Sequence, residues 1–202
     1  MAGTIKLDGT TFLTKDSSNN FTLDVGSGGT ISQGTIGSNV TFPAKMIIKT
    51  YYAEYTDQAS TTYAQDTWHD IPNLSITTDV PKSTSSNFLL FGSTHFGIDD
   101  WSPKTRFYNS TTSTAIGVGT NPLSSQEPAS FTGYTWNSTN SSQMFGGSGF
   151  ALQTGNTGVA QNFKLQGYSG RDPFVINRSY TNSNDDISGN AVISTLIVME
   201  IA

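Results

Sequence analysis

Short runs of alternating apolar and polar residues dominate the chain after its first 45 residues. In the run from Leu74 to Val80, an apolar or β-branched residue stands at every second position, and Pro81 ends the run. A period of two is that of a half-buried β-strand. The run 87–92, with the sequence Asn-Phe-Leu-Leu-Phe-Gly, is apolar at both parities, which indicates a central strand covered on both faces. Further strands are predicted at 46–55, 106–109, 114–118, 130–136, 149–153, 162–168, 173–179 and 191–201.

No stretch predicts a helix, because β-branched residues and glycine interrupt every candidate 3.6-residue pattern. Many short strands separated by turn-forming clusters predict an all-β, antiparallel β-sandwich over residues 46–202. Immunoglobulin-like Greek keys and jelly rolls both meet this description. Long polar stretches at 121–130, 137–148 and 154–160 favour the jelly roll, with these loops extending from the ends of the sandwich.

Residues 1–45 have a different texture, with isolated apolar residues among Gly, Thr, Ser and Asn. This pattern predicts short strands joined by turns. Such a segment buries little apolar surface by itself, so we expect an anchor or stalk that needs partners, with a flexible linker as the alternative. The candidate anchoring residues are Ile5, Leu7, Phe12, Leu13, Phe21 and Leu23.

The last predicted strand is apolar on both of its faces. One face of a sheet fills the domain core, so the other face must be covered by another part of the chain or by symmetry-related copies. The sequence alone leaves both possibilities open. The candidate interface residues are Leu196, Val198, Ile193, Ile197, Met199 and Ile201.

Composition excludes several classes of function. Charged residues make up only 12% of the 202 positions and the net charge is -5, so no basic patch is available for nucleic acid or for an anionic membrane. Cysteine is absent, which removes disulfides and thiolate chemistry. No apolar run has the length of a signal peptide or a membrane span, so we expect synthesis in the cytoplasm without membrane insertion.

Catalytic and metal-binding patterns are weak. The two histidines, His69 and His95, would need carboxylates brought to them by the fold to form a zinc site. No Gly-x-Ser-x-Gly motif and no fixed carboxylate pair is present, and the acidic turn at 182–186 lacks the spacing of an EF-hand loop. We therefore expect no enzyme activity and no cofactor. Three aromatic residues are candidates for contact with a host surface glycan, with core packing as the alternative: Trp101, Tyr134 and Trp136.

Four segments together resemble marine bacteriophage fibre-type and other virion surface proteins: Thr-Phe-Pro-Ala at 41–44, Trp-His-Asp-Ile-Pro-Asn-Leu-Ser-Ile at 68–76, Pro-Lys-Ser-Thr-Ser-Ser-Asn-Phe-Leu-Leu at 81–90, and Ile-Ser-Thr-Leu-Ile-Val-Met-Glu-Ile at 193–201. The resemblance spans roughly residues 29–92 and 191–202. It implies a homotrimeric jelly roll of the tumour-necrosis-factor or complement-globular-head kind, behind an N-terminal segment that attaches to the virion. One departure is that Phe-Tyr-Asn-Ser-Thr at 107–111 replaces a region where that family commonly carries an arginine.

From this resemblance we expect a short trimeric fibre or knob on the virion surface. Residues 1–45 would bind other virion proteins of the capsid, tail or portal, and residues 46–202 would form the jelly-roll domain that contacts the host. A capsid decoration protein that stabilises the head is the alternative, and a host-glycan-degrading enzyme is a more distant one. The sequence does not separate a fibre from a decoration protein, whereas copy number per particle would.

Overall fold

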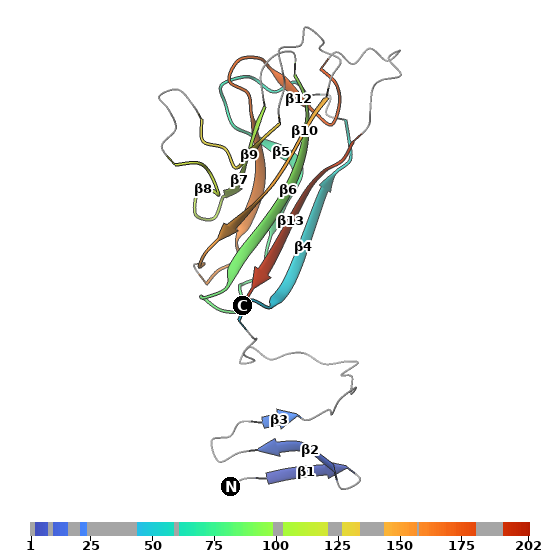
Figure 1. Cartoon of the computed structure of the whole chain (residues 1–202), viewed down its shortest axis with the longest axis vertical. Coiled ribbons are helices and arrows are strands. Elements are labelled where there is room, and N and C mark those ends of the chain that lie inside the picture. The colour runs from blue at the N-terminus through green and yellow to red at the C-terminus, as the bar shows by residue number, and fades with distance from the viewer. Residues whose placement is uncertain are drawn as a thin grey trace. The chain divides into compact units, whose positions relative to one another are not determined.

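The structure is a computed structural model that describes residues 3–7, 10–15, 21–23, 44–58, 61–98, 103–120, 127–133, 144–156, 158–180 and 192–202. The chain divides into two compact units, Met1–Val40 and Thr41–Ala202. Within these described ranges the regular elements are all β-strands, and no helix is long and apolar enough to cross a membrane (Figure 1). The prediction of an all-β chain is confirmed.

The first unit is an antiparallel sheet of three short strands: β1 (Gly3–Leu7), β2 (Thr10–Lys15) and β3 (Phe21–Leu23). Ile5 pairs with Leu13, and Leu13 pairs with Leu23, so three of the apolar positions share one cross-strand row. The short strands that the sequence predicts for this region are therefore present.

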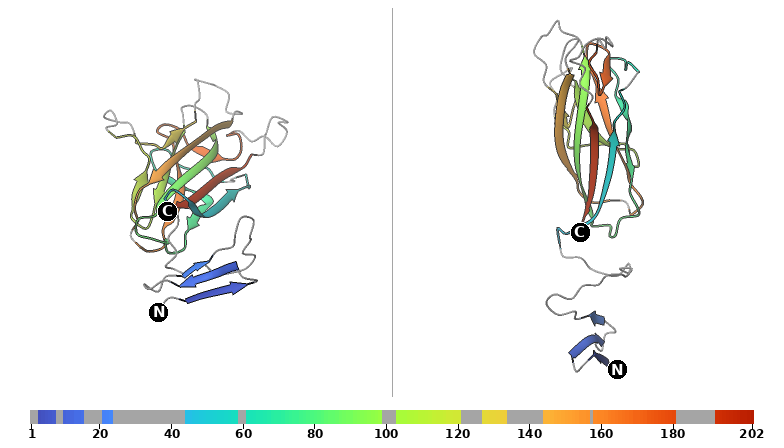
Figure 2. Two further views of the ribbon diagram at one scale, coloured as in Figure 1. Left: turned by 60° about the horizontal axis from the view of Figure 1, so that its bottom comes forward. Right: turned by 90° about the vertical axis from the view of Figure 1, so that its right-hand side faces the viewer.

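The second unit contains two antiparallel sheets, seen from two further directions in Figure 2. The first, called the β6 sheet, has the order β10 (Met144–Gln153), β6 (Asn87–Ile98), β13 (Ser194–Ile201), β4 (Ile47–Tyr55), and β12 (Phe174–Ile176) pairs with the end of β6. The second, called the β11 sheet, has the order β5 (His69–Thr77), β11 (Asn162–Tyr168), β7 (Lys104–Asn109), β8 (Thr114–Ile116), and β9 (Phe131–Thr132) pairs with β7.

The two sheets pack face to face around one hydrophobic core, as the prediction of a β-sandwich requires. Phe88 of β6 and Phe163 of β11 are fully buried, with their ring centroids 5.0 Å apart. Gly92 lacks a side chain where the sheets approach closely, because a Cβ atom there would lie 2.9 Å from Cε1 of Phe107 and 3.0 Å from Cδ1 of Leu165. Alternation along each strand thus fills the interior from both sides.

Strand boundaries differ from the sequence prediction where polar residues enter the core. β6 continues to Ile98, beyond the predicted run 87–92. Thr94 is fully buried there, and its hydroxyl lies 2.8 Å from the hydroxyl of Thr105 on the opposite sheet. This hydrogen bond satisfies both polar atoms, so the two threonines can occupy the core. Val80 was predicted within a strand, but β5 ends at Thr77 and Val80 is exposed.

The first and last strands of the sandwich lie side by side. β4 pairs with β13 along its whole length, and beyond the strands Lys45 N donates to Ala202 O at 2.9 Å, while Ala202 N donates to Met46 O at 2.9 Å. Residues 45 and 202 are therefore direct neighbours.

Candidate subunit interface

The outer face of the β6 sheet carries two neighbouring rows of mainly apolar side chains, the first of which crosses all four of its main strands. In antiparallel sheets, paired residues project from the same face, so the pairing register defines each row. The first row crosses β10, β6, β13 and β4 as Phe150, Phe91, Ile197 and Tyr52. The second row contains Leu152, Leu89, Met199 and Thr50. Ile201 and Ile47 pair beyond them at the end of β13.

We call this surface the apolar face, comprising Ile47, Tyr52, Leu89, Phe91, Phe150, Leu152, Ile197, Met199 and Ile201. Phe150 is 72% exposed and Leu152 51% exposed, although both lie in the middle of a regular strand. The rings of Phe91 and Phe150 lie side by side, with centroids 6.3 Å apart. A contiguous apolar patch of this kind is rare on monomeric soluble proteins and marks an interaction surface.

The structure separates the six candidate interface residues of the last strand into two groups. Ile197, Met199 and Ile201 are partly exposed on the apolar face, and Ile193, just before β13, is exposed. Leu196 and Val198 are completely buried between the two sheets. These two residues belong to the core of the domain, which corrects their place among the interface candidates. The expectation that β13 has one face in the core and one apolar outer face is confirmed.

Sequence reasoning missed the part of the apolar face that lies outside β13. Its most exposed members, Phe150 and Leu152, are on β10, and Tyr52 is on β4. One signal was available, since the run 87–92 is apolar at both parities. That run includes Leu89 and Phe91, which project outward between β10 and β13.

Two polar groups border the apolar face. On β4, the Tyr52 hydroxyl donates to Oε2 of Glu54 at 2.7 Å, and this hydrogen bond raises the pKa of the Tyr52 phenol. On β6, His95 pairs with Gly146 of β10, and a Cβ atom on this glycine would lie 3.0 Å from the imidazole. Burial lowers the pKa of His95, partly opposed by a hydrogen bond with the backbone of Ile193, and its Nδ1 atom is buried without a hydrogen-bond partner in the described part of the chain.

The other candidate residues lie in the first unit or outside the described ranges. The anchor candidates occupy the three short strands, with Ile5 and Leu7 on β1, Phe12 and Leu13 on β2, and Phe21 and Leu23 on β3. The candidate glycan contacts Trp101, Tyr134 and Trp136 fall outside the described residues. Among residues that the structure does describe, no group of three or more His, Asp or Glu side chains could hold a metal ion.

The sequence matches no model of a known protein family, and no curated protein matches it. The geometry of the two sheets therefore carries the functional argument.

Proposed function

We propose that this chain is a non-enzymatic, homotrimeric surface protein of a bacteriophage virion, which forms a short fibre or knob. Residues 46–202 make the trimeric domain and residues 1–45 attach it to other virion proteins. The apolar face is the observation that carries this proposal, and the resemblance to phage surface proteins gives the assembly its biological setting.

The strand order supports a jelly roll for the trimeric domain. Counted along the chain, the eight main strands are β4, β5, β6, β7, β8, β10, β11 and β13. The β6 sheet then contains the sixth, third, eighth and first strands, and the β11 sheet contains the second, seventh, fourth and fifth. This interleaving of early and late strands is what a rolled pair of Greek keys produces.

The free energy available from the apolar face supports a stable assembly. Fully burying a Phe or Leu side chain contributes about 1.5–3 kcal/mol. Phe150, Leu152 and Tyr52 are each more than half exposed in the single chain. Covering these three alone would contribute several kcal/mol per protomer, before the partly exposed residues of β6 and β13 are counted.

The edge position of Phe150 and Leu152 supports a ring rather than a two-fold dimer. A closed trimer is built from heterologous contacts, in which each subunit uses two different surfaces. β10 ends the β6 sheet among the described strands, so these two side chains extend the apolar surface from the sheet face to the sheet edge. A groove of about 620 Å³, lined in part by Ile116 of β8 and by Leu152, lies along the same edge.

The first unit, Met1–Val40, lies within the segment 1–45 and supports its role in attachment. Its strands contain only five, six and three residues. A sheet with so few residues buries little apolar surface to offset the conformational entropy lost on ordering, so packing against other elements would stabilise it. Other virion proteins, of the capsid, tail or portal, would supply that packing.

A capsid decoration protein is the second candidate, because a trimer anchored by an N-terminal segment would suit a shell at its three-fold positions. Quantifying the chain against the major capsid protein in purified particles distinguishes the two. Tens of copies per particle support a fibre, and hundreds support decoration. A monomer at micromolar concentration would contradict the trimer, and glycan hydrolysis that is lost on mutating a carboxylate would favour the enzyme.

A further inference from the structure

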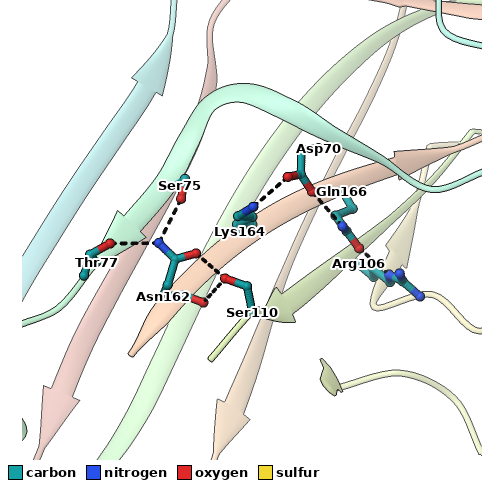
Figure 3. A network of polar contacts seen from close by, with 8 residues as sticks. All are labelled: Asp70, Ser75, Thr77, Arg106, Ser110, Asn162, Lys164 and Gln166. Atoms are coloured by element: carbon teal, nitrogen blue, oxygen red, sulfur yellow. Dashed lines mark hydrogen bonds and ion pairs between the residues drawn. The ribbon is translucent and has the colours of Figure 1, made fainter. Parts of the chain in front are cut away.

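The outer face of the β11 sheet carries two neighbouring groups of hydrogen-bonded polar side chains from three adjacent strands (Figure 3). It lies on the opposite side of the sandwich from the apolar face, because each sheet turns its other face to the common core. We call it the polar face, comprising Asp70, Ser75 and Thr77 of β5, Asn162, Lys164 and Gln166 of β11, Arg106 of β7, and Ser110 just beyond β7.

Asn162 fixes one end of the polar face. Its Nδ2 atom donates to Thr77 Oγ1 at 2.8 Å and to Ser75 Oγ at 3.1 Å. Its Oδ1 atom accepts from the hydroxyl of Ser110. The side-chain amide therefore has both of its N–H groups and its oxygen engaged, and it holds three hydroxyl groups in set positions.

A second chain of contacts fixes the middle of the polar face. The Asp70 carboxylate accepts from Lys164 Nζ at 2.7 Å and from Gln166 Nε2 at 2.7 Å. Gln166 Oε1 in turn accepts from Arg106 Nε at 2.7 Å. Gln166 is only 9% exposed, so this bridge is built into the sheet surface. Burial raises the pKa of Asp70, but the hydrogen bonds from Lys164 and Gln166 outweigh it and the net pKa is lowered.

Aromatic rings flank the network at Arg106. The guanidinium lies 4.2 Å from the ring centroid of Trp68 and 5.1 Å from that of Tyr108. Trp68 in turn contacts Tyr168 at a ring distance of 5.1 Å. Stacking holds the guanidinium in place, while its two Nη atoms form no hydrogen bond or ion pair with any residue that the structure describes.

This arrangement presents fixed donors and fixed acceptors side by side. Hydrogen-bond donors available to a ligand are the Nη groups of Arg106, the remaining N–H bonds of Lys164, and the hydroxyls of Ser75 and Thr77. The unused lone pairs of the Asp70 carboxylate are the acceptors. Long side chains on an exposed strand lose entropy when they are held in one geometry. Organisation of this kind is what a binding site needs before its ligand arrives.

The charges of the polar face select the chemistry of the ligand. Asp70 is paired with Lys164. The positive charges of Arg106 and of Lys104, whose Nζ lies 5.5 Å from the ring centroid of Tyr168, are offset by two carboxylates. Glu127 Oε2 accepts from Nε1 of Trp68 at 3.4 Å, and Asp66 Oδ1 accepts from the Tyr168 hydroxyl at 3.4 Å. A site with balanced charge does not favour a strongly ionic ligand. Hydroxyl groups both donate and accept, so they match an array in which donors and acceptors alternate, and the aromatic rings provide apolar contact for the carbon face of a ring.

We propose that the polar face binds a neutral, hydroxyl-rich saccharide. The site spans Asn162 to Gln166, about 13 Å at about 3.3 Å per residue, and continues to the aromatic rings, which suits an extended oligosaccharide. The inference refines the host contact of the proposed function by naming a ligand class and a site outside the loops. Since one protomer contains the whole site, binding does not rest on trimer formation, although three copies on one particle would add avidity.

Isothermal titration calorimetry on the full chain tests the site with neutral hexasaccharides of glucose, galactose or mannose, and with a hexasaccharide of uronic acid. Asp70→Asn removes the charge of the acceptor that Lys164 and Gln166 share, and Arg106→Gln removes the guanidinium that contacts Gln166, Trp68 and Tyr108. Asp79→Asn is the matched control, because it removes the carboxylate of the Lys49–Asp79 ion pair, outside the polar face. Thermal unfolding of each variant checks that the fold is kept, and sedimentation of the same samples reports the oligomeric state separately.

The expected result is binding of at least one neutral hexasaccharide, with affinity lowered about tenfold or more by Asp70→Asn and by Arg106→Gln and unchanged by Asp79→Asn. Three results would overturn the proposal: no neutral hexasaccharide binds, only the uronic acid probe binds, or binding is lost with Trp136→Ala but kept in Asp70→Asn and Arg106→Gln. A trimer that binds no saccharide would refute the site and leave the proposed function intact.

Discussion

Replacing Phe150 with serine tests the apolar face at its most exposed residue. The side chain is 72% exposed in the single chain, so it contributes little to the core, and the substitution should leave the folded protomer nearly as stable as before. If the face is covered in the trimer, each protomer loses about 1–2 kcal/mol, which is 72% of the value for burying a whole Phe side chain. Three protomers together lose about 3–6 kcal/mol.

This loss increases the trimer dissociation constant by about two to four orders of magnitude. Sedimentation equilibrium of the full chain over a range of concentrations measures that constant directly. Val80→Ser is the matched control, because Val80 is 64% exposed but lies outside the apolar face. Assembly of Phe150→Ser that is as tight as that of the unmodified chain, or equal weakening by Val80→Ser, would refute the reasoning.

Two further predictions concern the protomer. Burial lowers the pKa of His95, against a smaller opposing effect of the Ile193 backbone, so the folded state binds its proton less readily than the unfolded state. The free energy of unfolding should therefore be at its full value above a pH of about 6.5 and decrease as the pH falls below it, as measured by urea unfolding. If the free energy of unfolding of a His95→Gln variant decreased with falling pH as steeply as that of the unmodified chain, this prediction would be contradicted. A Cβ atom on Gly97 would lie 2.3 Å from the backbone oxygen of Arg178, so Gly97→Ala should destabilise the fold by about 3 kcal/mol or more, as measured by thermal unfolding. Gly119→Ala is the control and should be neutral in the same measurement, because a Cβ atom there would have no atom within 4 Å.

Much of the sandwich follows from local patterns that the sequence displays. The strand predicted at 162–168 has the same bounds as β11, and the run 46–55 differs from β4 by one residue. Both segments combine β-branched or aromatic residues with clear turn signals at their ends. The N-terminal half of β10 was missed, because Gly146 and Gly147 are poor strand formers and hold an extended conformation here through pairing with β6.

The candidate interface was only partly predictable, for a physical reason. Periodicity assigns residues of one strand to two faces, and it identified β13 as apolar on both. Periodicity does not say which of the two faces turns to the core. For this reason Leu196 and Val198 were included with Ile197 among the interface candidates. Nor does it align strands that are distant in sequence, so the row from Phe150 through Phe91 to Tyr52 emerges only from the pairing register.

The pairing of Lys45 with the last residue, Ala202, bears on how the sandwich can be combined with other proteins. A domain whose two ends are adjacent can be placed within a surface loop of an unrelated protein, since the recipient loop has to open by little more than the spacing of two strands. The same closeness permits circular permutation, with a short peptide joining residue 202 to residue 45 and new termini cut elsewhere. The sandwich is thus a transferable module for recombination and for display of fused peptides.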